Sequence, residues 1–296
     1  MDIYPVVIIG AGPAGLTAAM QLSRQGVTPV VFEKNQVGGL LLNANLVENY
    51  PGFVDGISGP ALIDLFRKQA DRLGVIVKQE EVISVHFKKD LFQVNTKDRE
   101  VQARYLVAAT GTKARTLPQD QFTGEFEGVL FSEVFPLINK KNKQVVIYGA
   151  GDAALDYALN LARNNQVIIL NRGTKIKGLP LLWDRIKKVD SIKYFSDKEI
   201  NNVVRDVSGR IMISAGKGAD KEIFDCDYLL TAIGRDPELG FSQGTFLKKF
   251  DQLKDKKRLY FIGDLHNGSY RQTALAVGDG IQAAMQIGQR LEKEIT

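Results

Sequence analysis

The chain has 296 residues, of which 44% are apolar and 25% are charged. This composition excludes collagen, mucin, disordered and coiled-coil architectures, and the length predicts one large domain or two medium ones. Lys and Arg number 39 against 34 Asp and Glu, so the formal net charge is +5. With a single cysteine, Cys226, the chain has no intrachain disulfide and no four-thiolate iron–sulfur cluster. Only two histidines accompany it, so we predict no metal site.

The N-terminal segment 3–23 carries no charged side chain and is long enough to suggest a membrane span. Gly10, Gly12, Pro13 and Gly15 interrupt it, and no basic segment precedes it. The pattern therefore predicts a strand, a turn and a helix rather than a span or a signal peptide. We expect a cytoplasmic protein with no membrane partner.

A glycine-rich turn, GAGPAG at 10–15, follows the β-branched run 4–9 and precedes a helix predicted to begin at Leu16. A second strand, 29–32, ends at Glu33, which lies 23 residues after the first glycine. This order is typical of a dinucleotide site, where the turn admits a pyrophosphate and the acid binds the adenosine ribose. The alternative is a glycine-rich turn of another α/β fold.

A similar unit begins 139 residues later, with a strand at 144–148, the turn GAGDAA at 149–154, a helix and a strand at 167–170. The same offset of 23 from Gly149 falls on Arg172, and Lys175 and Lys177 follow. An arginine suits a 2′-phosphate, so the sequence predicts NADPH rather than NADH. The alternative is that these are solvated basic residues.

Between the two units lies a strand-rich stretch, 75–106, and residues 113–119 and 236–244 are the predicted crossovers between two domains. Segments 171–193 and 248–258 are strongly basic. Such segments can attract an acidic partner or can simply be solvated. No nucleic-acid motif accompanies them, so we expect no nucleic-acid partner.

Six motifs in this order resemble the low-molecular-weight thioredoxin reductase-like flavoproteins over nearly the whole chain. Besides the first turn they are GGLL at 38–41, VENYPGF at 47–53, ATG at 109–111, GD at 263–264 and YRQT at 270–273. The resemblance implies an α/β fold of two Rossmann-like three-layer nucleotide-binding domains, with the NAD(P) domain inserted into the FAD domain. The implied boundaries are 1–114 and 241–296 for FAD, and 115–240 for NAD(P)H. It also implies a homodimer.

The resemblance also implies individual binding residues. It implies no metal ligands, and it implies no catalytic side chain because flavin and nicotinamide carry the chemistry. The predicted FAD-binding residues are Gly10, Gly12, Pro13, Ala14, Glu33, Lys34, Gly39, Leu40, Asn49, Val82, Thr110, Gly111, Gly263, Asp264, Arg271, Gln272 and Thr273. The predicted NADP-binding residues are Gly149, Gly151, Asp152, Ala153, Arg172, Lys175, Lys177 and Gly234.

The chain departs from thioredoxin reductases at their CxxC dithiol, where Ser132 and Phe135 stand. Neither residue can form a thiolate or a mixed disulfide. The branch that lacks the dithiol is the thioredoxin reductase-like ferredoxin/flavodoxin–NADP⁺ reductases. Those enzymes commonly extend past the last helix to cover the flavin, whereas this chain ends at Thr296, so we expect a flavin face that is either more open or covered by another group.

The resulting expectation is an FAD-dependent NADPH oxidoreductase that passes electrons to an external acceptor, most simply an acidic ferredoxin or flavodoxin. Two alternatives remain open: a flavin-direct reductase of an external disulfide or small oxidant, and a non-catalytic flavin-binding regulatory protein.

Overall fold

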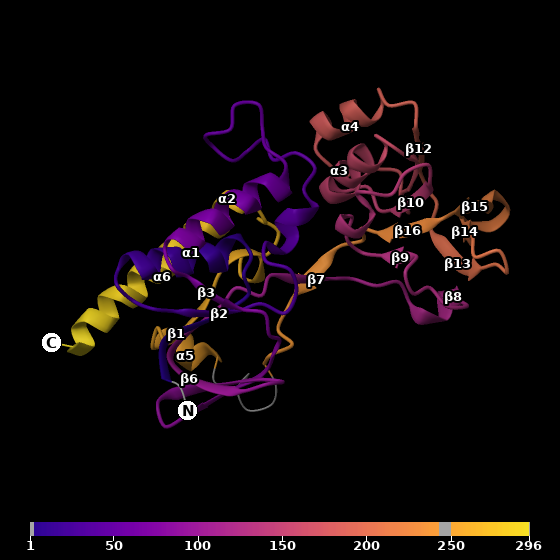
Figure 1. Ribbon diagram of the computed structural model, residues 1–296. Coiled ribbons are helices and arrows are strands. Elements are labelled where there is room, and N and C mark those ends of the chain that lie inside the picture. Colours follow the sequence, from indigo (N-terminus) through magenta and orange to yellow (C-terminus); the bar gives the residue numbers. More distant parts are fainter. Residues whose placement is uncertain (1–2, 243–249, 296) are drawn as a thin grey trace. The chain divides into compact units, whose positions relative to one another are not determined.

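The computed structural model describes residues 3–242 and 250–295, which form two compact units (Figure 1). Unit 1 comprises Met1–Leu42, Val47–Lys113 and Pro237–Thr296, and unit 2 comprises Asn43–Leu46 and Ala114–Asp236. The last two residues of the predicted crossover 236–244, including Gly244, lie outside the described residues. Apart from the short segment Asn43–Leu46, the chain enters unit 2 within β7 (Thr112–Ala114) and leaves it within β17 (Arg235–Pro237), and these two strands pair with each other.

Unit 1 is built on a seven-stranded mixed sheet of order β3-β2-β1-β6-β5-β4, with β18 also paired to β6. The strands β1, β2, β3, β6 and β18 are parallel, and β4, β5 and β6 form an antiparallel meander. The strands are β1 (Ile3–Ile9), β2 (Val30–Phe32), β3 (Ile76–Lys78), β4 (Val82–Lys88), β5 (Leu91–Thr96), β6 (Glu100–Ala108) and β18 (Leu259–Phe261).

Helix α1 (Pro13–Arg24) packs against both α2 (Gly59–Arg72) and α6 (Thr273–Ile295), as Figure 1 shows. Its contact with α6 is close because Gly280 offers no side chain: a methyl group there would lie 2.5 Å from the carbonyl oxygen of Ala14. The short α5 (Phe250–Asp255) precedes β18. The uncharged N-terminal segment is thus a strand and a helix, as predicted, and no helix in the described part of the chain is long and apolar enough to cross a membrane.

Unit 2 contains a five-stranded parallel sheet of order β12-β11-β10-β16-β9 and a four-stranded sheet of order β15-β14-β13-β8. The strands are β8 (Phe122–Thr123), β9 (Leu130–Phe131), β10 (Gln144–Tyr148), β11 (Gln166–Leu170), β12 (Ile192–Phe195), β13 (Ile200–Arg205), β14 (Ile211–Ala215), β15 (Glu222–Cys226) and β16 (Tyr228–Thr231). The helices are α3 (Asp152–Leu161) and α4 (Pro180–Ile186). The core of β10 is fully buried from Val145 to Ile147, as expected for a parallel strand covered on both faces.

The unit boundaries differ from the predicted ones at two places. Residues 237–240 belong to unit 1, because the Glu238 amide donates to the Gly111 carbonyl and the Glu238 carbonyl accepts from Thr110. Residues 43–46 belong to unit 2, because the Asn45 amide donates to the Asp156 carboxylate at 2.8 Å. The sequence carries no local signal for this second assignment.

Candidate dinucleotide-binding sites

The first glycine turn, between β1 and α1, has the shape that a pyrophosphate requires. Gly10 has φ +103°, and a methyl group there would lie 2.4 Å from the Ala109 carbonyl oxygen. A methyl group at Gly15 would lie 1.9 Å from the Gly10 carbonyl oxygen. A methyl group at Gly12, by contrast, would meet no atom within 4 Å, so the backbone before Pro13 is open to a ligand. The first and third glycines are therefore needed for packing and the second for access, which fits a bound FAD.

Glu33 follows β2 and is buried, with 9% of its surface exposed. Its carboxylate accepts the Ala11 amide at 2.7 Å and the Asn35 amide at 2.9 Å. Each oxygen retains a further lone pair, so the same carboxylate can accept a ribose hydroxyl. The adjacent Lys34 pairs with Glu238 at 3.5 Å.

Other predicted FAD residues lie along the same edge of the unit 1 sheet, after the carboxyl ends of β6 and β18 or beside the turn. The Gly38 amide donates to the Ala11 carbonyl, which brings Gly39 and Leu40 to the turn. A methyl group at Gly39 would lie 3.3 Å from the Gly12 Cα. Gly263, ahead of Asp264, approaches so near to Ala14 that a methyl group there would lie 2.9 Å from the Ala14 Cβ. The remaining predicted residues on this edge, Thr110 and Gly111, follow β6 after one intervening residue, Ala109.

Two predicted segments far apart in the sequence are joined by a hydrogen bond. The Asn49 side-chain amide donates to the Gln272 side chain at 2.7 Å. Gln272 directly precedes α6, with Arg271 before it and Thr273 as the first helical residue. Val82 differs from these residues because its side chain is buried in the unit 1 core. Only its backbone is left to contact a ligand.

The second glycine turn, between β10 and α3, repeats this geometry in unit 2. Gly149 has φ +135°, and a methyl group there would lie 2.3 Å from the Ala232 carbonyl oxygen. Gly151 is the N-cap residue of α3 and has an extended backbone, and a methyl group there would meet no atom within 4 Å. Asp152 and Ala153 begin the helix, and Gly234 lies just beyond β16, the neighbour of β10.

The loop after β11 folds back onto this turn. The amides of Lys177 and Gly178 both donate to the Ala150 carbonyl, at 3.0 and 3.1 Å. The Asp152 carboxylate accepts the Leu179 amide at 2.6 Å. The exposed side chains of Arg172, Lys175 and Lys177 are therefore carried by a loop that is fastened to the glycine turn.

Strand register shows that Arg172 is not the counterpart of Glu33, although the offset of 23 suggests it. The Gly10 amide donates to the Phe32 carbonyl, and the Gly149 amide donates to the Leu170 carbonyl. The residue after Leu170 is Asn171, which is therefore the counterpart of Glu33. The interval from the first glycine of the turn to this position is one residue shorter in unit 2 than in unit 1. Asn171 is buried and its side chain donates to the Lys175 carbonyl and the Tyr194 hydroxyl. The sequence prediction overlooked Asn171, which strand pairing alone reveals.

The segment 131–135, which stands where thioredoxin reductases carry their dithiol, contains no cysteine. Ser132 Oγ lies 3.2 Å from Thr231 Oγ1, and the Phe135 amide donates to the Asn43 side chain. Cys226 lies elsewhere, at the end of β15, fully buried. Burial raises the pKa of its thiol to about 12, so it stays protonated and unreactive at neutral pH.

Taken together, each unit has a strand–glycine turn–helix site at the carboxyl edge of parallel strands, which defines a two-nucleotide flavoprotein oxidoreductase. The Pyridine nucleotide-disulphide oxidoreductase family model matches residues 4–280. The chain belongs to this family, whose thioredoxin reductase-like members use FAD and NADPH. It is a flavin-dependent pyridine nucleotide oxidoreductase.

Named relatives and solved structures agree with this assignment. The chain is 31% identical over 298 residues to the thioredoxin reductase of Mycolicibacterium smegmatis, covering 96% of this chain and 95% of that protein. It is similar to the crystal structure of Lactococcus lactis thioredoxin reductase in its FR conformation, with a TM-score of 0.83, 26% identity and coverage of 97% and 98%. The T. acidophilum thioredoxin reductase gives a TM-score of 0.84, 25% identity and full coverage of both chains. The predicted fold class is thus confirmed.

Among residues 3–242 and 250–295, no group of three His, Cys, Asp or Glu side chains is placed to hold a metal ion.

Proposed function

We propose that this chain is a dithiol-free NADPH oxidoreductase, in which electrons leave FAD directly for an external acceptor. The observation that carries the proposal is that the chain has no pair of cysteines to form a dithiol. The sequence contains one cysteine, and that residue is buried with a raised thiol pKa. A protein dithiol would need two thiols, one of them able to ionise.

The residues of each unit would then hold and orient the cofactors. The α1 N-terminus and Gly12 would hold the FAD pyrophosphate, and Glu33 would accept the ribose hydroxyls. In unit 2, the α3 N-terminus and Arg172 would hold the pyrophosphate and the 2′-phosphate of NADPH. Bound flavin and nicotinamide supply hydride transfer and electron storage, which amino-acid side chains do not provide.

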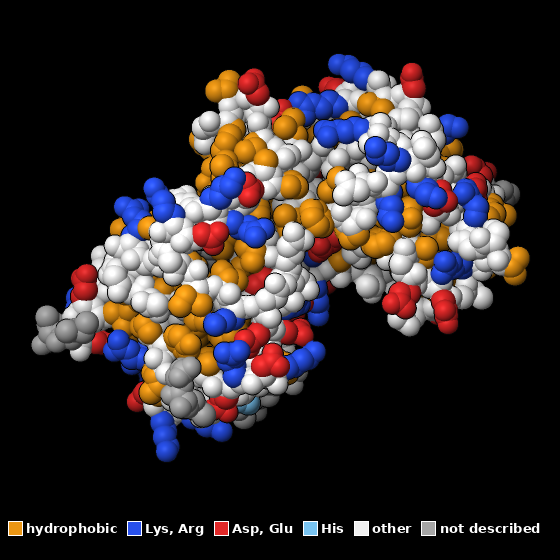
Figure 2. All heavy atoms as spheres, viewed as in Figure 1, with side chains coloured by type: hydrophobic (Ala, Val, Ile, Leu, Met, Phe, Trp, Pro, Cys, Tyr) orange, Lys and Arg blue, Asp and Glu red, His pale blue; other side chains and the backbone are white. Residues whose placement is uncertain are grey.

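An acidic electron carrier of the ferredoxin or flavodoxin type is the acceptor that we propose. Segment 171–193 contains seven Lys and Arg against two Asp, and the visible face of unit 2 shows Lys and Arg side chains over α3, α4 and β12 (Figure 2). A basic face raises the rate of encounter with an acidic partner.

A second candidate is direct reduction of an external disulfide, because relatives at 31% identity are thioredoxin reductases. An anaerobic acceptor assay with NADPH separates the two. We expect reduction of ferredoxin or flavodoxin, falling steeply with added salt, and no reduction of thioredoxin or of a low-molecular-weight disulfide. Turnover with the disulfides and none with the carriers would establish the second candidate instead.

The assembly that we propose is a homodimer. Helix α6 exposes three apolar side chains, Leu275, Ile281 and Met285, at 46%, 39% and 45%. Exposed apolar side chains on one helix suit an interface between subunits. Light scattering on the eluted protein should give twice the 32.7 kDa mass of one chain, and a monomer at micromolar concentration would contradict the proposal.

A further inference from the structure

Unit 2 contains a polar hollow that the dinucleotide sites do not use. Its volume is about 630 Å³, and its walls come from the segments around the starts of β10, β11, β12 and β16, with Arg210 contributed by the residue before β14 of the second sheet. Because these strands are parallel, the hollow lies at the amino edge of the sheet. The Gly149 turn lies at the carboxyl edge, one strand length away, which is about 16 Å for the five residues of β10.

The walls are rich in cations and poor in anions. Lys141, Lys143, Arg163 and Arg210 line the hollow, with Asp227 as the one carboxylate among the described lining residues. Lys141 and Arg163 are exposed and form no ion pair with any residue that the structure describes, although Arg163 donates to the Asn45 side chain. Arg163 lies in the field of the partly buried Asp156, which is not a lining residue, and both Lys141 and Arg163 are solvent-exposed at the hollow.

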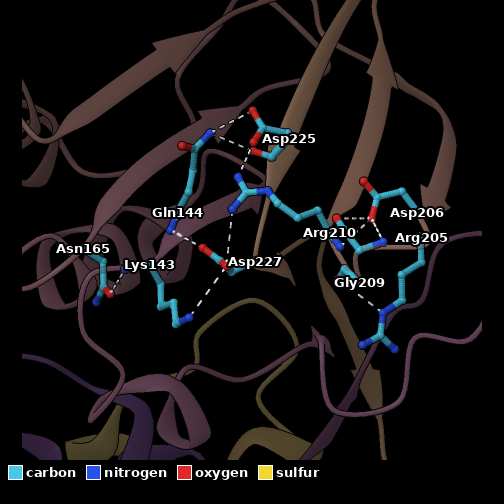
Figure 3. A network of polar contacts seen from close by, with 10 residues as sticks. Lys143, Gln144, Asn165, Arg205, Asp206, Gly209, Arg210, Asp225 and Asp227 are labelled. Atoms are coloured by element: carbon cyan, nitrogen blue, oxygen red, sulfur yellow. Dashed lines mark hydrogen bonds and ion pairs between the residues drawn. The ribbon is translucent and has the colours of Figure 1, made fainter.

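The other two cations are held in place, as Figure 3 shows. The Asp227 carboxylate accepts the Gln144 amide at 2.8 Å and lies 3.4 Å from an Arg210 guanidinium nitrogen and 3.8 Å from Lys143 Nζ. Arg210 also pairs with Asp225 on β15. Two carboxylates, Asp225 and Asp227, thus orient Arg210 and Lys143 and balance the charge of these two cations.

The backbone around the hollow is fixed by its own hydrogen bonds. The Asn142 amide donates to the Asn164 carbonyl, and the Gln166 amide donates to the Lys143 carbonyl. The buried Asn165 side chain accepts the Lys143 amide and donates to the carbonyls of Lys140 and Leu161. The site is therefore pre-formed, and a ligand would not need to order these loops.

We propose that this hollow, which we call the amino-edge pocket, binds the phosphate groups of a small anionic molecule. Two of the four lining cations are guanidinium groups, which bind phosphate oxygens in pairs, and the exposed Lys141 and Arg163 favour an anionic ligand. The concave shape and the volume, which fall in the range of small-molecule sites, favour a small ligand over an acidic protein surface. The pocket would work beside the NADPH site and independently of it.

The test is calorimetric titration of inorganic pyrophosphate into the FAD-loaded protein saturated with NADP⁺, which occupies the other phosphate-binding turn. We expect saturable one-to-one binding that weakens as salt rises. The double variant Lys141→Gln, Arg163→Gln should bind at least tenfold more weakly, since it loses both exposed cations of the pocket. The matched control Lys217→Gln, Lys221→Gln removes the same charge from exposed positions outside the pocket and should change the affinity less than about twofold.

A gain-of-binding variant keeps the test decisive if the double variant fails to fold. Gln166→Lys adds a cation at an exposed position of the pocket wall and should tighten pyrophosphate binding several-fold. No saturable binding, or equal weakening by the pocket and control variants, would overturn the proposal. A pocket variant that instead loses affinity for an acidic carrier protein, with pyrophosphate binding unchanged, would also overturn it, because the basic surface would then serve a protein partner.

Discussion

Arg172 is exposed on the loop after β11, and the buried residue before it is the neutral Asn171. In unit 1 the equivalent strand end carries the carboxylate of Glu33, which would repel a 2′-phosphate. Unit 2 therefore lacks the repelling group and offers a guanidinium one residue further along. This arrangement supports NADPH as the nucleotide more firmly than the offset of 23 residues does.

Replacing Arg172 with Ala should raise the Michaelis constant for NADPH by roughly 10–100-fold, because a hydrogen bond to a charged group contributes about 1.5–3 kcal/mol. NADH has no 2′-phosphate, so its constant should change far less. The contact is remote from the reacting atoms and should leave kcat nearly unchanged. Steady-state kinetics with both nucleotides checks this, and equal losses for the two would mean that Arg172 does not contact the 2′-phosphate.

Individual residues were predictable from sequence where a local rule fixes them. Gly10 and Gly149 adopt positive φ immediately after buried strands, and both were recognised from strand, turn and helix signals alone. Asn171 was missed because a fixed residue count cannot detect that the interval is one residue shorter. Side-chain pairs such as Asn49 with Gln272 join segments 223 residues apart, so only the folded chain reveals them.

Each glycine turn serves one unit, so damage to one turn should affect one nucleotide. Gly149→Ala places a methyl group 2.3 Å from the Ala232 carbonyl at a strained φ. We expect a rise of tenfold or more in the NADPH Michaelis constant with FAD retained, because strain of this kind costs about 1–3 kcal/mol. Flavin absorbance and steady-state kinetics measure the two effects. Gly173→Ala, where a methyl group meets nothing within 4 Å, is the matched control and should resemble the wild type.

Helix α3 is linked to segment 43–46 through Asp156, whose carboxylate accepts the Asn45 amide and lies in the field of Arg163. Burial raises the pKa of this carboxyl to about 6, against 3.8 in the unfolded chain. Between these values the folded state binds the extra proton, so this group stabilises the fold more as the pH falls from about 6 to about 4, and that contribution is lost as the pH rises again.

Asp156→Asn should remove this dependence, because the amide oxygen can still accept the Asn45 amide while carrying no charge. We expect the free energy of unfolding of the variant, relative to wild type, to increase by about 2–3 kcal/mol between pH 4 and pH 7. Urea titrations at several pH values measure this difference. A difference that does not vary with pH would show that Asp156 titrates normally in the folded protein.

At the scale of the whole molecule, the duplication of strand, glycine turn and helix predicted two nucleotide-binding units, and the relatives confirm that architecture. The crossovers were less predictable, because the chain changes unit inside the short paired strands β7 and β17 rather than in a loop. The assignment of residues 43–46 to unit 2 depends on contacts with residues about 90–118 positions away, which no sequence pattern indicates.

The central claim, that electrons leave the flavin without passing through a protein thiol, depends on Cys226 being inert. The most direct measurement is anaerobic stopped-flow kinetics of the Cys226→Ser variant, following NADPH-driven flavin reduction and the subsequent reduction of an added flavodoxin or ferredoxin. We predict that both rates equal those of the wild type within about twofold, since the buried thiol has a pKa of about 12 and does not ionise at neutral pH. A loss of tenfold or more in acceptor reduction, with FAD still bound and flavin reduction intact, would contradict the account.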